Sequence, residues 1–291
     1  MSLDDLEAEE CLTLRRFHGG PMQYTQNSYQ PDPPLRGVFI DCETTGLDPE
    51  VDKIIQLAIV PFTFWPDGTV CASEEAVVFH EDPGTPLSPF ISKLTGLTDD
   101  DVRDCRIPDV RVFEIIAGAA IIVAHNAEFD RQFLEKRFPT FETMRFGCSQ
   151  TDVPWLDNGY TSNKLEWLAF KHMGAFFDAH DAATDAYMGI HLLASQVGAR
   201  SGMSYMLDAA RTKWVRLYAV NTPYDSRHVL KARGYIWRNG DDGQPKSWSI
   251  DSPMGEALEA ECVWLEENVG GRYVEHVTFD SRKRFSARIG R

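Results

Sequence analysis

The sequence predicts an α/β sandwich followed by a small α+β module. Two observations support this prediction. Runs rich in β-branched and aromatic residues come first along the chain, and helical periodicities then alternate with strand-like runs. The charge balance inverts near residue 200, because residues 1–199 carry 14 basic and 32 acidic side chains whereas residues 200–291 carry 15 and 12. We therefore expect an N-terminal arm at 1–35, an α/β domain at 36–200 and a small basic module at 205–291.

The composition is that of an ordinary globular protein, with 43% hydrophobic and 25% charged residues. No apolar run approaches the roughly 18 residues that a membrane span needs, and the six cysteines lie far apart, as expected of reduced thiols. The sequence therefore predicts a cytoplasmic protein with no membrane partner. The net charge of −15 by itself argues against nucleic acid, because phosphate backbones are held by lysine and arginine.

The first part of the chain reads as an arm and three strands. One helix is expected in the arm from the spacing of Leu3, Leu6 and Leu12. Strands are then expected from Val38 to Glu43, from Lys53 to Phe64 and from Val70 to His80. Because their connections are short, these strands favour an antiparallel meander.

Helices and strands alternate after residue 86. Ser88 and Thr98 are expected to cap short helices. Further helices are expected at 109–117, from Phe129 onward, at 164–171 and at 180–197, with buried strands at 120–124 and 146–152. This alternation predicts helices packed against a sheet.

The basic module reads as a second, smaller sheet with helices. Strands are expected at 214–220, 235–237, 247–250 and 273–279, with a turn at 240–243 and helices at 225–233 and 253–268. Its tryptophans are expected in the core rather than stacked on bases: Trp214, Trp237, Trp248 and Trp264. Its basic residues cluster at 200–238 and 282–291, where they form either a solvated surface or a phosphate-contacting patch.

Two carboxylates, Asp41 and Glu43, stand two residues apart at the end of the first strand. Residues i and i+2 of a strand point to the same face, so both side chains face one side. Neighbouring carboxylates on a buried surface repel each other and lose hydration, and a hard divalent cation relieves both costs. This stretch therefore predicts a metal site, although a single Asp-x-Glu pattern is common.

Later carboxylates make the prediction more specific. Asp130 stands in the first turn of a helix that follows a buried strand. His180 precedes Asp185 by five residues, about 140° around a helix, so one helical face cannot present both unless His180 lies just before the helix. The sequence thus offers three carboxylate segments and one histidine.

Taken together, Asp41/Glu43, Asp130 and His180/Asp185 resemble the three motifs of the DEDD superfamily of 3′→5′ exonucleases, in its histidine-containing branch. That branch includes the proofreading subunit of bacterial replicative DNA polymerase. The resemblance covers roughly residues 36–198, and three ordered motifs are more specific than any one of them. It implies a ribonuclease H-like fold with a mixed five-stranded sheet, and two divalent metal ions, Mg²⁺ or Mn²⁺.

The resemblance also implies the roles of the five motif residues. Asp41 would contact both metals, Glu43 and Asp185 would complete the first site, and Asp130 would support the second. His180 would act as the general base, since an imidazole exchanges protons near neutral pH. Four converging carboxylates account in part for the acidic charge.

Further residues match the segments that hold the 3′-terminal nucleotide in this family. The expected substrate contacts are Thr44, Thr45, Gly46, Leu47, Asn126 and Phe129. Two of them have structural alternatives, helix capping for Asn126 and core packing for Phe129, and Asp181 is read mainly as a helix cap. The C-terminal module resembles small modules appended to bacterial exonuclease-like chains, without a function that transfers.

The expected function is a metal-dependent 3′→5′ exonuclease that releases 5′-mononucleotides from single-stranded or frayed DNA. Its partners would be nucleic acid 3′ ends, within a DNA replication or repair assembly. An exoribonuclease that trims RNA is the alternative substrate class, because nothing near Leu47 must read a 2′-hydroxyl. A catalytically silent binding subunit is the third alternative, and the intact set of repelling carboxylates argues against it.

Overall fold

The computed structural model describes residues 13–25, 33–178, 180–240, 246–269 and 272–289. Among these, six strands form one mixed sheet in the order β4-β3-β2-β6-β7, with β5 also paired to β3. The strands are β2 (Leu35–Thr44), β3 (Ile54–Phe64), β4 (Val70–Ser73), β5 (Val77–His80), β6 (Ile121–Ala124) and β7 (Phe146–Cys148). Strand β2 runs antiparallel to β3 and parallel to β6, so the predicted mixed sheet is confirmed.

The expected single strand Val70–His80 is two segments along the same edge of β3. Strand β4 pairs with the end of β3 and β5 with its beginning. Between them, the hydroxyl of Tyr187 accepts a hydrogen bond from the backbone N–H of Ala76 and donates one to the carbonyl of Glu74. These bonds lie where the strand is interrupted, and the interruption gives the sheet six strands where five were expected.

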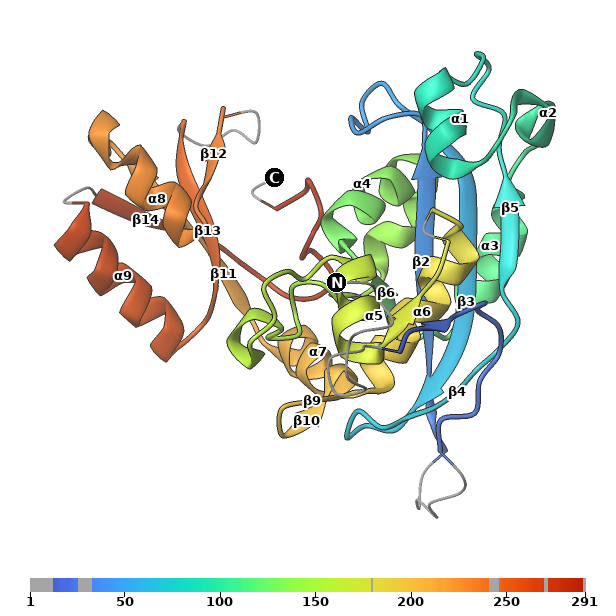
Figure 1. The fold of residues 1–291 in the computed structure, drawn as a ribbon. Helices are drawn as coiled ribbons and strands as arrows, with labels where there is room; N and C mark the ends of the chain where they lie inside the picture. Colours follow the sequence, from blue (N-terminus) through green and yellow to red (C-terminus); the bar gives the residue numbers. More distant parts are fainter. Residues whose placement is uncertain (1–12, 26–32, 179, 241–245, 270–271, 290–291) are drawn as a thin grey trace, which may run out of the picture.

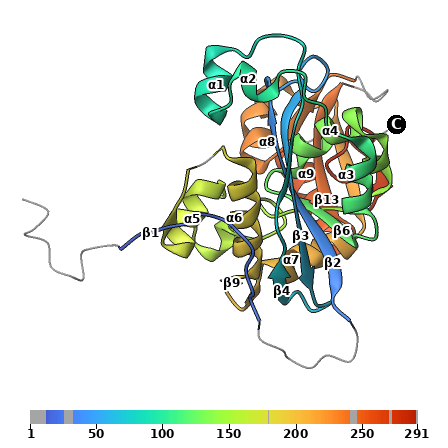
Figure 2. The same ribbon diagram turned by 90° about the vertical axis from the view of Figure 1, so that its right-hand side faces the viewer.

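Helices cover both faces of this sheet (Figure 2). Helices α5 and α6 lie on one face, and α3 and α4 lie on the other. The helices of this part are α1 (Pro89–Thr95), α2 (Asp99–Val102), α3 (Asp109–Ile116), α4 (Ala127–Arg137), α5 (Leu165–Met173), α6 (Ala182–Ala194) and α7 (Gly202–Arg211), with short 3-10 helices at Pro139–Thr143 and Leu156–Asn158. Ser88 and Thr98 cap α1 and α2, as predicted.

Alternating side chains of β2 enter two separate cores. Phe39 packs in the core beneath α5, α6 and α7, whereas Val38 and Ile40 pack in the core beneath α3 and α4. Helix α6 approaches β2 closely at Gly189, where an added Cβ would lie 2.1 Å from the Cζ atom of Phe39. The contact between α6 and β2 therefore depends on a residue without a side chain.

A second sheet follows in the order β12-β13-β11-β14, all antiparallel (Figure 1). Its elements are β11 (Trp214–Val220), a 3-10 helix (Tyr224–Ser226), α8 (Arg227–Arg233), β12 (Ile236–Arg238), β13 (Ser247–Pro253), α9 (Glu256–Asn268) and β14 (Arg272–Phe279). Leu230 and Leu265 of the two helices pack with Trp248 in its core, while Trp237 is 47% exposed. Short strand pairs, β1 (Arg15–Arg16) with β8 (Ala175–Phe176) and β9 (Gln196–Val197) with β10 (Arg200–Ser201), complete the described elements.

Helix α7 spans the boundary expected between the two parts, and the pattern-based analysis did not find it. Its Met203 and Met206 are fully buried in the core beneath α5 and α6. The division of the chain into arm, domain and module stays a prediction. The helix expected around Leu3 to Leu12 and most of the 240–243 turn lie outside the described residues.

The end of the chain returns to the main sheet (Figure 1). The backbone N–H of Phe146 in β7 donates to the carbonyl of Ser281 at 2.9 Å. Arg284 pairs with the buried Asp152, and Arg288 pairs with Glu135 on α4. Both arginines are therefore paired with carboxylates of the main part of the molecule and do not form the solvated surface that was one of the two expectations.

Two absences hold for the described part of the chain. Cys42, Cys71, Cys105 and Cys148 are free thiols. None of its helices combines the length and the apolar character needed to cross a membrane.

Candidate active site

The end of strand β2 carries Asp41 and Glu43. Their side chains alternate with Cys42, which packs in the core beneath α3 and α4, so the two carboxylates share the opposite face. The pairing of β2 with β3 shifts register directly after Glu43. Such an irregularity bends the strand and redirects side chains at its end.

Asp130 comes from helix α4, which starts directly after β6. The turn between them holds Asn126 in a left-handed conformation at φ 97°. The backbone N–H of Cys42 donates to Oδ1 of Asp130 at 3.1 Å. A backbone group of β2 thus fixes the position of a carboxylate that stands 88 residues later.

His180 and Asp185 lie at the start of helix α6. Asp181 caps the helix, because its Oδ1 accepts from the N–H of Thr184 at 2.9 Å. His180 precedes the helix with a left-handed backbone at φ 67°, and its N–H donates to Oδ2 of Asp185 at 3.1 Å. The non-helical position of His180 is what the five-residue spacing predicts, and capping by Asp181 is the role favoured for it.

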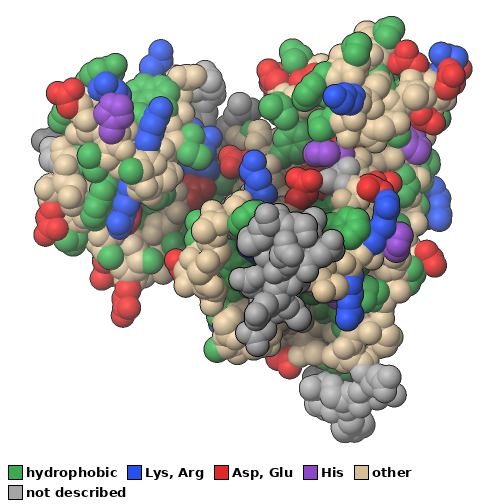
Figure 3. All heavy atoms as spheres, in the orientation of Figure 1, with side chains coloured by type: hydrophobic (Ala, Val, Ile, Leu, Met, Phe, Trp, Pro, Cys, Tyr) green, Lys and Arg blue, Asp and Glu red, His purple; other side chains and the backbone are tan. Residues whose placement is uncertain are grey.

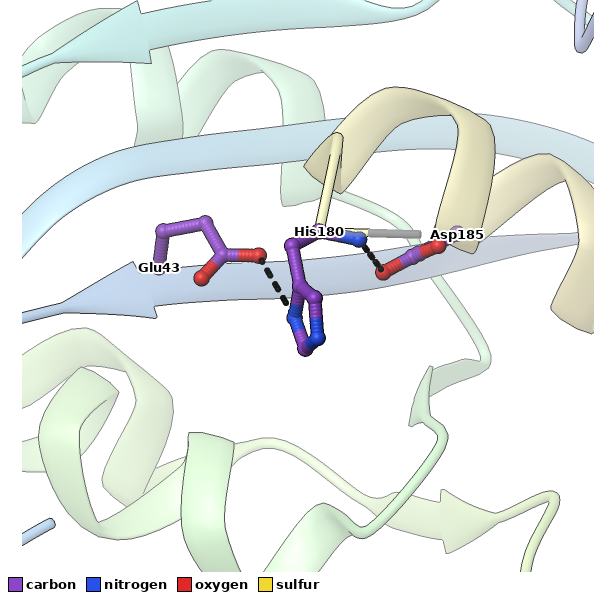
Figure 4. Close-up of side chains that lie close together, drawn as sticks. All are labelled: Glu43, His180 and Asp185. Carbon is purple, nitrogen blue, oxygen red and sulfur yellow. Dashed lines mark hydrogen bonds and ion pairs between the residues drawn. The ribbon is translucent and has the colours of Figure 1, made fainter. Parts of the chain in front are cut away.

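The side chains of Glu43, His180 and Asp185 lie close together (Figure 4). Nδ1 of His180 lies 3.9 Å from Oε1 of Glu43. One ligand atom each of Glu43, His180 and Asp185 lie within 4.8 Å of one another. Asp41 and Asp130 line the same cavity of about 400 Å³, so all five motif residues face one cavity.

Burial and the charges of nearby carboxylates raise the pKa of every carboxylate in this cluster. Burial is the larger cause for Glu43, followed by the charges of Asp185 and Asp130, and together they raise its pKa to about 8. The same two causes raise the pKa of Asp41 well above its usual value. Burial raises the pKa of Asp130 and of Asp185 to about 7, although backbone hydrogen bonds from Cys42 and His180 oppose the change.

The cluster fits a divalent cation. Oδ1 of Asp185 is buried and has no hydrogen-bond partner among the described residues. Buried polar oxygens normally have a partner, and an ion is one explanation when they do not. Hard divalent cations prefer carboxylate oxygens, and their charge would offset the repulsion that raises these pKa values. Asp41, Glu43, Asp130 and Asp185 are the residues that would hold such ions.

The predicted substrate contacts are mostly placed at this cavity. Thr44, Gly46, Leu47, Asn126 and Phe129 line it. Thr45 does not line it, because its hydroxyl donates to Oδ1 of Asp52 at 3.0 Å and helps fix the 44–53 loop. The side chain of Asn126 makes no capping hydrogen bond, and Phe129 both packs on Phe133 and lines the cavity.

The rim of the cavity contains apolar residues that the sequence analysis missed. Phe90 and Leu94 of α1 line it together with Leu47, and Phe90 is 71% and Leu47 84% exposed. Figure 3 shows hydrophobic side chains next to acidic and histidine side chains on this face. The four-residue spacing of Phe90 and Leu94 behind a capping serine places both on one side of a short helix, but it does not tell whether that side faces a core or a cavity.

His125 also lines the cavity, but the protein holds it firmly as a structural residue. Its ring nitrogens lie 2.8 Å from the Ser149 hydroxyl and 2.9 Å from the Asn163 carbonyl. Burial lowers the pKa of His125 to about 4. The imidazole is therefore neutral near pH 7.

Comparison with known proteins agrees with this geometry. Residues 38–193, more than half of the chain, match the family described as exonuclease, of the RNase T type. This chain belongs to that exonuclease family. Members of the family generally use divalent metals, in keeping with the carboxylate cluster.

The relatives of this exonuclease include much longer proteins. The PolC-type DNA polymerase III of Lacticaseibacillus paracasei is 31% identical over 186 residues, which is 60% of this chain and 12% of that protein. The corresponding polymerase of Bacillus subtilis is 32% identical over 185 residues, or 58% of this chain and 12% of that protein. The chain therefore spans about an eighth of the length of these relatives.

A solved structure shares the fold. The zinc-bound complex of Escherichia coli exonuclease I with single-stranded DNA aligns with a TM-score of 0.50 at 15% identity. The alignment covers 79% of this chain and 67% of that one. This likeness supports the arrangement of a mixed sheet flanked by helices.

Proposed function

We propose that this exonuclease removes nucleotides from the 3′ end of single-stranded or frayed DNA, using two divalent ions, Mg²⁺ or Mn²⁺. The observation that carries the proposal is the convergence of Asp41, Glu43, Asp130, His180 and Asp185 on one cavity. The polymerase relatives and the DNA-bound structural neighbour support DNA as the substrate class. A role in a DNA replication or repair assembly is part of the same proposal.

The chain's own residues divide the work. Asp41, Glu43, Asp130 and Asp185 would hold the ions, which when bound would lower the pKa of water and stabilise charge on the reacting phosphate. The ring of His180, 45% exposed at the mouth of the cluster, accepts the proton of the attacking water. Leu47 and Phe90 offer apolar surfaces for the terminal base, and Asn126 offers an amide to the strand.

The test is the shortening of a 5′-labelled oligonucleotide in the presence of Mg²⁺ or Mn²⁺. We expect a ladder of shorter products that retain the 5′ label. Asp185→Asn removes a metal-binding charge and is expected to slow this shortening by about 10²-fold or more. Asp181→Asn is the matched control, because asparagine caps helices as well as aspartate does, and it is expected to keep most of the activity.

Each result has a clear meaning. Loss of the label as a mononucleotide in the first step would indicate attack from the 5′ end, against the proposal. Equal activity of Asp185→Asn and the unchanged protein would remove the cluster from the reaction. A matched RNA oligonucleotide in parallel decides the substrate class, and faster shortening of RNA would favour the exoribonuclease alternative.

A further inference from the structure

A second cavity, of about 420 Å³, lies between the second sheet and the main part of the molecule. Figure 3 shows the molecule hollowed between these two parts. One wall is the sheet of β11, β12 and β13, and the others are helix α4 and the C-terminal segment 284–289. We call it the intersheet cavity. None of the five motif residues lines it.

The wall formed by the second sheet is polar because of strand alternation. Val215 and Leu217 of β11 pack in the core on the side of α8 and α9, so the intervening Arg216 faces the opposite side. The same alternation brings Arg238 of β12 and Ser249 of β13 to the intersheet cavity. Figure 1 shows α8 and α9 on the side of this sheet that faces away from the main part of the molecule. The cavity-facing side thus keeps cationic groups that neither α8 nor α9 covers.

The three arginines at this cavity, Arg216, Arg238 and Arg284, differ in how many of their guanidinium donors have partners among the described residues. Arg216 makes a two-bond ion pair with Asp251, at 2.6 and 2.8 Å. Arg284 pairs through Nη2 with Asp152, but its Nη1 is buried and has no hydrogen-bond partner within the described chain. Arg238 donates from Nε to the hydroxyl of Ser249 at 3.2 Å, and no described carboxylate pairs with it.

Unsatisfied guanidinium donors of this kind indicate an anionic ligand. A buried donor without a partner is costly, and most such groups in folded proteins have one. Guanidinium groups bind phosphate oxygens in particular, through charge-assisted hydrogen bonds. Glu128 also lines the cavity, but it is exposed at the margin, and Asp251 is already neutralised by Arg216.

The location connects this cavity to the candidate active site. Helix α4 contributes Asn126, Phe129 and Asp130 to the active-site cavity, with Asn126 at its N-cap, and Glu128 and Gln132 to the intersheet cavity. The two cavities therefore lie on neighbouring faces of one helix, whose diameter with side chains is about 10 Å. A strand that leaves the first cavity reaches the second by passing this helix.

We propose that the intersheet cavity binds a phosphate group of the nucleic acid strand whose 3′ end occupies the active site. This inference rests on the proposed function. Arg238, which pairs with no described carboxylate, and Arg284, whose Nη1 has no hydrogen-bond partner among the described residues, supply the positive charge. Ile236, which is 51% exposed, lines the cavity beside them as a surface for a sugar or base. The cavity makes binding depend on substrate length, because a strand too short to pass α4 cannot reach it.

Arg238→Gln tests this contact with little disturbance, since glutamine can keep the hydrogen bond to Ser249. Arg227→Gln is the matched control, because Arg227 lies on α8, on the opposite side of the same sheet. Binding of the full chain to a fluorescent trinucleotide and to a fluorescent oligonucleotide of about 16 nucleotides is measured by anisotropy in EDTA, over a range of salt concentrations.

We expect Arg238→Gln to weaken binding of the long oligonucleotide about tenfold and to leave the trinucleotide unchanged. Losing one phosphate contact should also reduce the slope of log affinity against log salt by about 0.7. Arg227→Gln should change neither value. Unchanged long-oligonucleotide binding by Arg238→Gln, or an equal loss for both lengths, would overturn the proposal.

Two further measurements test whether the cavity binds a free nucleotide instead of the strand, and whether the proposed function holds independently of this contact. Thymidine 5′-monophosphate serves as a competitor, and displacement of the long oligonucleotide that depends on Arg238 would assign the cavity to a free nucleotide and overturn the strand assignment. Hydrolysis of the trinucleotide with Mg²⁺ is followed separately. If it is absent while the binding difference remains, the proposed function fails and the phosphate contact stands.

Discussion

At the scale of single residues, His125 lines the active-site cavity and also contributes to the stability of the fold. It directly follows β6, is 9% exposed, and has both ring nitrogens hydrogen-bonded. Its pKa falls from 6.5 to about 4 because burial disfavours the imidazolium. Between these two values the unfolded chain binds a proton that the folded protein does not bind.

This difference predicts a stability that depends on pH. As the pH falls from 6.5 toward 4, His125 is expected to lower the free energy of unfolding by up to about 3 kcal/mol. Urea unfolding of the original protein and of His125→Gln at several pH values measures the effect. The difference in the free energy of unfolding between the unchanged protein and His125→Gln should become smaller as the pH falls. The active-site carboxylates have raised pKa values and act in the opposite direction, but they are common to both proteins and cancel in the difference.

A gap between the two proteins that stays constant from pH 7 to about 4 would contradict this reading. It would mean that His125 is protonated at the same pH in the folded and in the unfolded chain. A neutral imidazole accepts at one nitrogen and donates at the other, which suits a hydroxyl and a carbonyl as its two partners.

At the scale of elements, the position of helix α6 decides whether Asp185 reaches the carboxylates of β2. Gly189→Ala adds a methyl group where the Cζ atom of Phe39 lies 2.1 Å away, so the helix or the ring must move. We expect a loss of about 1–3 kcal/mol in the free energy of unfolding. We also expect a fall in kcat, because a shift of about 1 Å in a catalytic group can cost 10²-fold in rate.

The steric effect of Gly189→Ala on Phe39 can be separated from its effect on helix propensity. Alanine has a higher helix propensity than glycine, so the substitution would stabilise an isolated helix by about 1 kcal/mol. Adding Phe39→Leu makes room for the new methyl group and is expected to restore part of the stability. Urea unfolding and the oligonucleotide ladder measure both variants. No recovery in the double variant would show that Phe39 is not the obstacle.

Some elements of the site could be predicted from the sequence because their signals are local. The two-residue spacing of Asp41 and Glu43 places both side chains on one face of a strand. The five-residue spacing of His180 and Asp185 requires that His180 lie before the helix. The division of Val70–His80 into β4 and β5 could not be predicted in this way. The backbone between the two strands binds the hydroxyl of Tyr187, which stands 111 residues beyond Ala76.

The same limit applies to the surroundings of the site. Nothing in the pattern around Phe90 and Leu94 says whether they point inward to a core or outward to a cavity. The basic residues near the C-terminus also have no local signal for their partners, since Arg284 pairs with a residue 132 positions earlier. Contacts of this range are decided by the fold as a whole.

At the scale of the whole molecule, residues 280–289 near the C-terminus are part of the structure that holds helix α4. Arg131, next to Asp130, is 0% exposed and forms an ion pair with Glu135 at 2.6 Å. Its Nη atoms donate to backbone carbonyls of the C-terminal segment, those of Ser281, Arg282 and Arg284. A buried guanidinium without these acceptors would carry a large desolvation cost.

Arg284 provides the sharpest test of this arrangement. Burial raises the pKa of Asp152, and the charge of Arg284 opposes that change through an ion pair of 2.6 Å. Arg284→Met leaves the buried carboxylate uncompensated and is expected to lower the free energy of unfolding by about 3–5 kcal/mol. Arg282→Met is the matched control, because the Arg282 side chain is 51% exposed and only its carbonyl binds Arg131, so a change within about 0.5 kcal/mol is expected.

The double variant Arg284→Met with Asp152→Leu separates the ion pair from the rest of the segment. Replacing both partners of a buried pair removes the uncompensated charge, so this protein should be more stable than Arg284→Met alone. Urea unfolding at neutral pH measures all three variants. Equal stability of Arg284→Met and Arg282→Met would show that residues 280–289 merely lie on the surface of the exonuclease. The expected difference would instead mean that the end of the chain completes the domain whose active site begins about 240 residues earlier, at Asp41.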